Sequence, residues 1–112
     1  MASDSPAALP ATGGPVFFDR RELDRILRLY GFMVAAGEWR DYGIDQSREH
    51  VAFAVFRRTA EQPLYRIEKR PALARRQGAW SVTGPGGHVL KRGRELEAVL
   101  RFFDRKRFTV VE

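Results

Sequence analysis

Apolar residues between positions 19 and 36 recur with the period of an α-helix. The residues that share this face are Leu23, Ile26, Leu27, Tyr30 and Val34. Asp19 is a favourable N-cap, and Glu22 three residues later has the spacing of a capping box. Gly37 is typical of the position that ends a helix. The pattern predicts a helix over 19–36, with an earlier end at Gly31 as the alternative, because glycine weakens a helix interior.

The next fifty residues show short apolar or alternating runs separated by turn residues, which is typical of strands. Five strands are predicted at 39–45, 51–58, 64–69, 80–83 and 88–91. Residues 46–50 form a turn, and the sequence GPGG at 84–87 has the composition of a hairpin loop. Residues 71–77 have helical composition but only enough length for one turn.

A second helical stripe follows at 95–104, and a last strand is predicted at 108–111. Consecutive strands on short links favour an antiparallel sheet. We therefore expect one α+β domain over 16–112, with a mostly antiparallel sheet of about five to six strands and two helices packed on one face. The expected core residues are Leu23, Ile26, Leu27, Phe53, Val55, Ile67, Val82, Leu96, Val99 and Leu100. Residues 1–15, rich in Ala, Pro, Ser, Thr and Gly, are expected to be a flexible tail.

The composition excludes several kinds of chemistry and of cellular location. The chain has no cysteine, which excludes disulfides, thiolate metal sites and thiol catalysis. The N-terminus lacks the basic and apolar regions of a secretion signal, and no apolar run is long enough to span a membrane. We expect a cytoplasmic protein without a membrane partner.

Candidate catalytic groups do not converge. Glu38, Asp41 and Asp45 are close in sequence, but on a strand Glu38 lies on the face opposite Asp41 and Asp45. His50 and His88 lie in or near turns, lack the spacing of a metal-binding motif, and are expected to be exposed. These patterns favour a non-enzymatic protein that needs no cofactor or metal, with an enzyme as the third hypothesis.

Basic residues are the strongest functional signal. The net charge is +6 and the excess lies in the second half of the chain. The candidate anion-binding residues are Arg58, Arg66, Lys69, Arg70, Arg75, Arg76, Lys91, Arg92 and Arg94. Arginine suits bidentate contact with phosphate. The first hypothesis is a protein that binds the backbone of RNA or DNA. The alternative is an interaction or regulatory module that docks on an acidic protein, and a merely soluble surface is the simplest interpretation.

Aromatic residues decide between these hypotheses. Trp39, Tyr42, Tyr65 and Trp80 lie on predicted strands among basic residues, where they either belong to the core or are displayed for stacking on bases. A continuous face of basic residues with an exposed aromatic would favour nucleic acid. A basic face without one would favour a protein partner or plain solubility.

The start of the second helix is a more local candidate. Lys91, Arg92 and Arg94 surround Gly93 there, where no side chain suits the N-cap and cations oppose the helix dipole. A bound phosphate would relieve both problems. The simpler interpretation is that the three side chains extend into water.

Four sequence words, FFDRREL, AAGEWRDYGID, YRIEKRPALARRQGAWSV and LKRGREL, give the chain a family resemblance. It resembles a family of small alphaproteobacterial proteins catalogued as a domain of unknown function, over roughly residues 17 to 111. The resemblance implies a bacterial, intracellular protein. It carries over no catalytic or binding residue.

Overall fold

Helix α2 (Arg20–Ala35) begins and ends at the signals that the sequence contains. The backbone N–H of Asp19 donates to Glu22 Oε1, and the N–H of Glu22 donates to Asp19 Oδ1, both at 2.8 Å, which completes the predicted capping box. The helix passes through Gly31 without interruption. It ends at Gly37, whose φ of 81° lies in the left-handed region that favours glycine.

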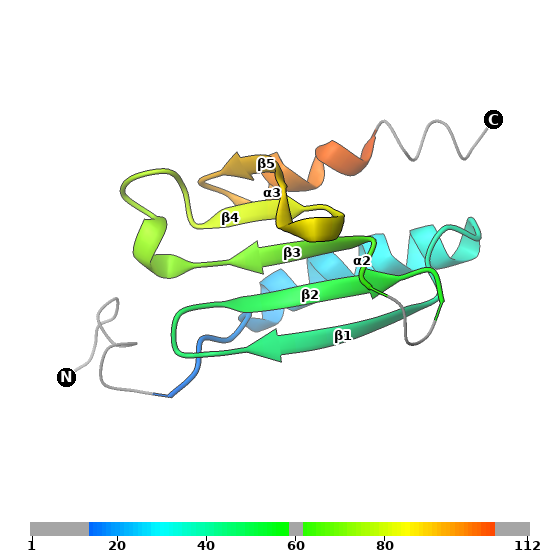
Figure 1. Ribbon diagram of the computed structural model, residues 1–112, viewed down its shortest axis with the longest axis horizontal. Coiled ribbons are helices and arrows are strands. Elements are labelled where there is room, and N and C mark those ends of the chain that lie inside the picture. The colour runs from blue at the N-terminus through cyan, green and yellow to red at the C-terminus, as the bar shows by residue number, and fades with distance from the viewer. Residues whose placement is uncertain (1–13, 59–61, 105–112) are drawn as a thin grey trace.

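The computed structural model describes residues 14–58 and 62–104, and Figure 1 shows the sheet formed by this part of the chain. The strands and short helices after α2 are β1 (Asp41–Gln46), β2 (Val51–Phe56), β3 (Tyr65–Lys69), η1 (Pro71–Leu73), β4 (Trp80–Thr83), η2 (Pro85–Gly87), β5 (Val89–Gly93) and α3 (Leu96–Leu100). The five strands pair in sequence order, and every pair is antiparallel. The predicted α+β fold with an antiparallel sheet is confirmed.

Alternation along the strands separates a buried face from an outer face. On β2, Val51, Phe53 and Val55 point toward the helices, whereas Ala52 and Ala54 point away from them. Ile67 on β3 and Val82 on β4 continue the buried face through the register of the sheet. The core contains Ile26, Leu29, Met33, Trp39, Phe53, Val55, Ile67, Trp80, Val82, Val99, Leu100 and Phe103. Both tryptophans therefore belong to the core, whereas Tyr65 is half-buried and Tyr42 is exposed.

The buried stripe of α2 differs from the predicted one. Leu29 and Met33 are buried together with Ile26, while Val34 is 39% exposed. Leu23, Leu27 and Tyr30 are half-buried and pack at the margin of the core. The predicted set mixed two neighbouring stripes, because α2 carries apolar residues over a wider arc than the sheet covers.

The second helix predicted at 95–104 is present as α3 (Leu96–Leu100), followed after a turn residue at Arg101 by helical residues at 102–104, and Phe103 reaches the core. Leu96 packs at the margin of the core, as a half-buried side chain. Figure 1 shows α2 behind the sheet and α3 beside β5. The ion pair between Arg25 and Glu97, with Nε and Oε2 2.6 Å apart, joins the two helices. The predicted strand at 108–111 and all but the last two residues of the predicted tail lie outside the described residues.

Truncation of core residues tests this packing. Leu100 is 2% exposed, so Leu100→Ala should lower the free energy of unfolding by about 2–5 kcal/mol. Leu27→Ala should cost less because Leu27 is only half-buried. Val34→Ala, at the exposed position of the same helix, should change stability by less than about 0.5 kcal/mol. Denaturant unfolding followed by circular dichroism would measure all three, and equal losses would contradict the assigned helix face.

Candidate functional site

Lys69, one of the candidate anion-binding residues, has a structural role. Its Nζ lies on the helix side of β3 and donates to Glu22 Oε1 at 2.7 Å and to the Phe17 carbonyl oxygen at 3.0 Å. The ammonium also lies 5.8 Å from the ring centroid of Trp80. Lys69 therefore joins β3 to the start of α2, and its charge is already partnered.

Arg66 and Arg70 are held by carboxylates on the outer face of the sheet. The Arg66 guanidinium lies 3.2 Å from Asp45 Oδ2 and 3.9 Å from Glu68 Oε2. Arg70 lies 3.8 Å from the same Glu68 oxygen. Because the charges of these two arginines are already paired with acids, they contribute little to an anion-binding surface.

The ion pair with Arg66 changes the acidity of Asp45. The hydrogen bond from Arg66 holds the pKa of the Asp45 carboxyl below its usual value, against an opposing effect of desolvation. His50 lowers the same pKa further, through its own contact with Asp45.

His50 is a site residue that the sequence analysis missed, because its side chain is only 17% exposed. Its Nε2 is buried without a hydrogen-bond partner among the described residues, 3.5 Å from Asp45 Oδ2 and 4.0 Å from Glu68 Oε2. Ala52 lies between Asp45 and Glu68 in the strand register, and His50 is two residues before it on the same face. The small alanine between two acids is the signal that could have placed the imidazole there.

The polar groups around His50 hold a turn together, and the Ser47 hydroxyl beside it is not arranged as a nucleophile. Ser47 Oγ accepts the backbone N–H groups of Glu49 and His50, each at 3.1 Å. The same oxygen lies 2.9 Å from His50 Nδ1, so the hydroxyl is fully engaged. Of the three carboxylates considered for catalysis, Asp45 lies beside His50, whereas Glu38 and Asp41 lie elsewhere. Glu38 pairs with Arg57, and Asp41 Oδ1 accepts the N–H of Tyr42. No group of three or more His, Asp or Glu suited to a metal ion occurs among the described residues.

Arg58 and Lys91 lie apart from the other candidate residues. Arg58 is exposed just after β2, and because β2 and β3 are antiparallel, this is the end of the sheet opposite to the end of β3. Lys91 is exposed in the middle of β5, beside Val82.

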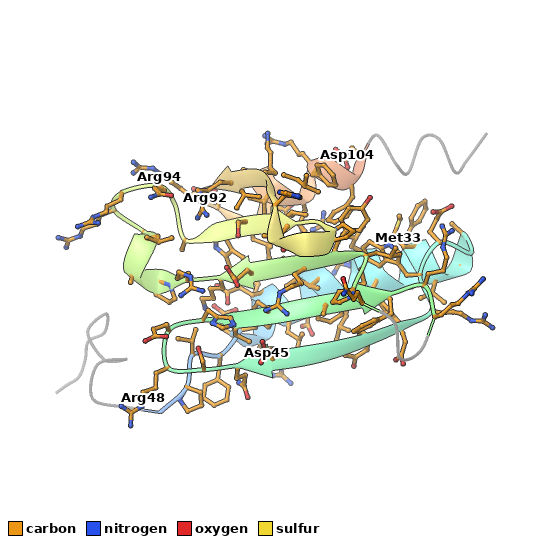
Figure 2. All side chains as sticks on the ribbon, in the orientation of Figure 1. Met33, Asp45, Arg48, Arg92, Arg94 and Asp104 are labelled. Atoms are coloured by element: carbon orange, nitrogen blue, oxygen red, sulfur yellow. The ribbon has the colours of Figure 1, made fainter. Side chains whose placement is uncertain are left out.

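Four arginines gather at the other end of the sheet, and we call them the arginine cluster. They come from two segments, the turn after η1 and the end of β5, and are Arg75, Arg76, Arg92 and Arg94. Figure 2 shows Arg92 and Arg94 at the end of the molecule where this turn lies. No carboxylate of the described residues is within ion-pair distance of any of the four.

Backbone contacts fix the two segments to each other. The N–H groups of Arg76, Gln77 and Gly78 all donate to the Leu73 carbonyl oxygen, at 2.9 to 3.1 Å, so the turn is tightly closed. Gly78 has a φ of 101° and approaches the backbone of Gly93 so closely that an added Cβ would collide with the Gly93 carbonyl oxygen. Arg92 also donates to the Gly78 carbonyl oxygen at 3.4 Å. The cluster is thus held by backbone and not by side-chain contacts alone.

The predicted phosphate site at the start of the second helix stays a prediction, and Glu95 there makes no side-chain capping hydrogen bond. The N-cap of α3 is Glu95, an acidic residue, and the helix has only five residues. Lys91 and Arg92 belong to β5, so they do not lie in the first turn of the helix. A helix this short has few aligned peptide dipoles for those cations to oppose.

The fold and the candidate site together define a class of protein. It is a small α+β domain, a five-stranded antiparallel meander covered on one face by two helices, and the arginines at one end of the sheet have no carboxylate partner among the described residues. The chain belongs to the family described as protein of unknown function (DUF2794), whose model matches residues 16–100. No curated protein and no solved structure matches the chain. In the described part of the chain, neither helix has the length and apolarity needed to cross a bilayer.

The acidity of Asp45 generates a test of the outer-face ion pairs. Because its pKa is lower in the folded protein than in the unfolded chain, the ionised form stabilises the fold. That stability is fully present above the unfolded pKa, about 3.9, and is lost as the pH falls through the folded value. Asp45→Asn should therefore flatten the decline in the free energy of unfolding below about pH 4. Denaturant unfolding across pH would show it.

The matched control is Asp24→Asn, which removes one carboxylate from the exposed side of α2. An acid-stability profile that is changed equally by both substitutions would contradict the role assigned to the pair between Asp45 and Arg66.

Proposed function

We propose that this protein binds the sugar-phosphate backbone of nucleic acid through the arginine cluster. The observation that carries the proposal is that Arg75, Arg76, Arg92 and Arg94 are brought to one end of the sheet without a carboxylate partner among the described residues. Elsewhere on the surface, Arg25, Arg57 and Arg66 each lie against an acid. Arg28 and Arg40 are also exposed without a carboxylate partner among the described residues, and the cluster differs from them because it brings four such cations from two segments to one end of the sheet.

The chemistry of the cluster favours phosphate. Guanidinium groups bind phosphate oxygens with two parallel hydrogen bonds and remain charged at every physiological pH. The backbone contacts of Gly78 with Gly93 fix the separation of the two segments before any ligand arrives. Binding would therefore order the arginine side chains but not the two segments that carry them, which lowers its entropic cost.

The cluster lacks aromatic residues, which by the criterion set from the sequence counts against single-stranded nucleic acid and leaves two candidate ligands, a duplex backbone and an acidic protein. Residues 70–79 and 89–95 contain no Phe, Tyr or Trp, and Trp80 beside them is buried. Single-strand binding commonly depends on stacking of bases on exposed rings. Duplex backbones need no stacking and present a higher density of phosphate, about one charge per 1.7 Å of DNA axis. We therefore propose duplex binding with little sequence preference.

The same absence of aromatic residues favours a second candidate function. An arginine cluster without stacking rings also suits a carboxylate-rich protein surface, as an interaction or regulatory module would use. The two candidates differ in what they bind directly, so one experiment separates them.

The test is a double charge reversal in the turn. Arg75→Glu/Arg76→Glu should abolish most binding to a labelled duplex, measured by fluorescence anisotropy, while circular dichroism stays unchanged because both side chains are exposed. For the wild-type protein, the logarithm of the association constant should fall with the logarithm of salt concentration by about 0.9 per neutralised phosphate. Arg75→Gln/Arg76→Gln should reduce that slope.

The control is Arg28→Glu/Arg40→Glu, which changes the net charge equally at two exposed arginines away from the cluster. Equal loss of binding in both charge-reversed proteins would mean that net charge alone attracts the duplex, and the proposed site would be wrong. A wild-type protein that binds polyglutamate but neither DNA nor RNA duplexes would favour the protein-docking function instead.

A further inference from the structure

The His50 imidazole lies between two carboxylates at the same end of the sheet as the arginine cluster. Figure 1 shows the turn between β1 and β2 and the connection through η1 at this end. The buried Nε2 is 3.5 Å from Asp45 Oδ2 and 4.0 Å from Glu68 Oε2, so it faces both acids without a hydrogen bond to either. A change of charge on the ring therefore acts directly on both carboxylates.

Ser47 determines which nitrogen of the neutral ring carries the proton. Its Oγ accepts the backbone N–H groups of Glu49 and His50, which occupy its two lone pairs. The hydroxyl proton is left to donate to His50 Nδ1, 2.9 Å away, so the neutral ring carries its own proton on Nε2. A second proton binds at Nδ1, and the hydroxyl can then turn to the His50 carbonyl oxygen, 3.5 Å away. The turn thus accommodates both charge states of the ring.

The charges around the ring cancel while His50 is neutral. The Arg66 guanidinium lies 3.2 Å from Asp45 Oδ2 and 3.9 Å from Glu68 Oε2. The Arg70 guanidinium lies 3.8 Å from the same oxygen of Glu68. Two carboxylates therefore face two guanidinium groups, and a proton on His50 leaves this group of side chains with an excess of positive charge.

The other charged residues near the ring do not offset that proton. Arg48 and Glu49, exposed in the turn, have opposite charges and form no ion pair within the described part of the chain. Lys69 lies on the helix side of the sheet and is paired there with Glu22. Histidine is the side chain whose charge ordinarily changes between pH 5 and 8. The charge at this end of the sheet therefore responds to pH in that range.

We propose that proton uptake by His50 strengthens the binding of a duplex backbone at the arginine cluster. This inference rests on the proposed function, because it concerns regulation of the same site. The imidazolium shares Asp45 and Glu68 with Arg66 and Arg70, so each guanidinium is less tightly held by its acid. The same proton adds one positive charge beside the cluster.

The structure connects these side chains to the cluster by two short routes. Arg70 begins the connection that carries the arginines of the turn, and its N–H is bonded to the Ala79 carbonyl oxygen at 2.7 Å. In the strand register, Glu68 lies opposite Ser81, and Ser81 lies opposite Arg92 of the cluster. Charge released from Glu68 is thus in the same row of the sheet as a residue of the binding site.

The first experiment measures duplex binding by fluorescence anisotropy at pH 8 and at pH 5.5, at constant ionic strength. The affinity of the wild-type protein should rise about fivefold at the lower pH, which is within the usual range of coupling between two sites. His50→Gln should remove most of this rise. His88→Gln is the matched control, because His88 is exposed between β4 and β5 at the opposite end of the sheet, and it should keep the rise. An equal rise in both variants would overturn the proposal.

A second experiment needs no nucleic acid and separates this proposal from the proposed function. The NMR signal of the Glu68 side-chain carboxyl carbon should shift between pH 5.5 and pH 8 in the wild-type protein and in His88→Gln, but not in His50→Gln. A signal that ignores His50 would overturn the proton switch even if the duplex binds at the arginine cluster. A signal that follows His50, in a protein that binds no duplex at either pH, would overturn the proposed function and with it this regulation.

Discussion

The structure depends on one constraint, which is that two helices cover only one face of a five-stranded sheet. Along β2, Val51, Phe53 and Val55 have no exposed surface and form the floor of the core. The intervening Ala52 and Ala54 lie on the face that the helices do not cover. Ala52 lies between Asp45 and Glu68 in the strand register, so longer charged side chains flank it there. This division determines which charges meet one another and which remain available.

Charge on this protein is therefore distributed by the sheet and not simply by composition. Strand alternation sends Lys69 to the helix side, where it meets Glu22, and sends Arg66 to the outer side, where it meets Asp45. Both cations count toward the net charge, but both are partnered within the fold. The arginines in the turn after η1 do not lie on a strand, and no acid of the described residues pairs with them.

Local signals in the sequence predicted the elements well, because each depends on neighbouring residues. The capping box at Asp19 and the glycine at 37 bound α2, and the GPGG sequence marks the hairpin between β4 and β5. The face of α2 that packs on the sheet was harder to predict from the sequence. Its apolar arc includes two stripes, and only the width of the sheet decides that Met33 is buried and Val34 is not.

The candidate site was harder to predict, because it depends on register. Nine basic residues look equivalent in the sequence, yet the pairing of β2 with β1 and β3 places Arg66 against Asp45 and Glu68 and sets His50 beside the same two acids. Arg75 and Arg76 lie near Arg92 and Arg94 because the backbones of Gly78 and Gly93 are in contact. The spacing of apolar residues along the sequence does not predict such a contact.

The close approach of Gly78 to Gly93 has a consequence for how this protein can vary. Connections between strands ordinarily accept insertions, since they cross open solvent. Residues 70–79 are different, because the Arg70 N–H is bound to the Ala79 carbonyl oxygen at 2.7 Å and Gly78 lies against the neighbouring strand. An added residue would separate the turn from β5 and change the spacing between two pairs of guanidinium groups. The length of this connection is therefore constrained more strongly than the identity of most residues within it.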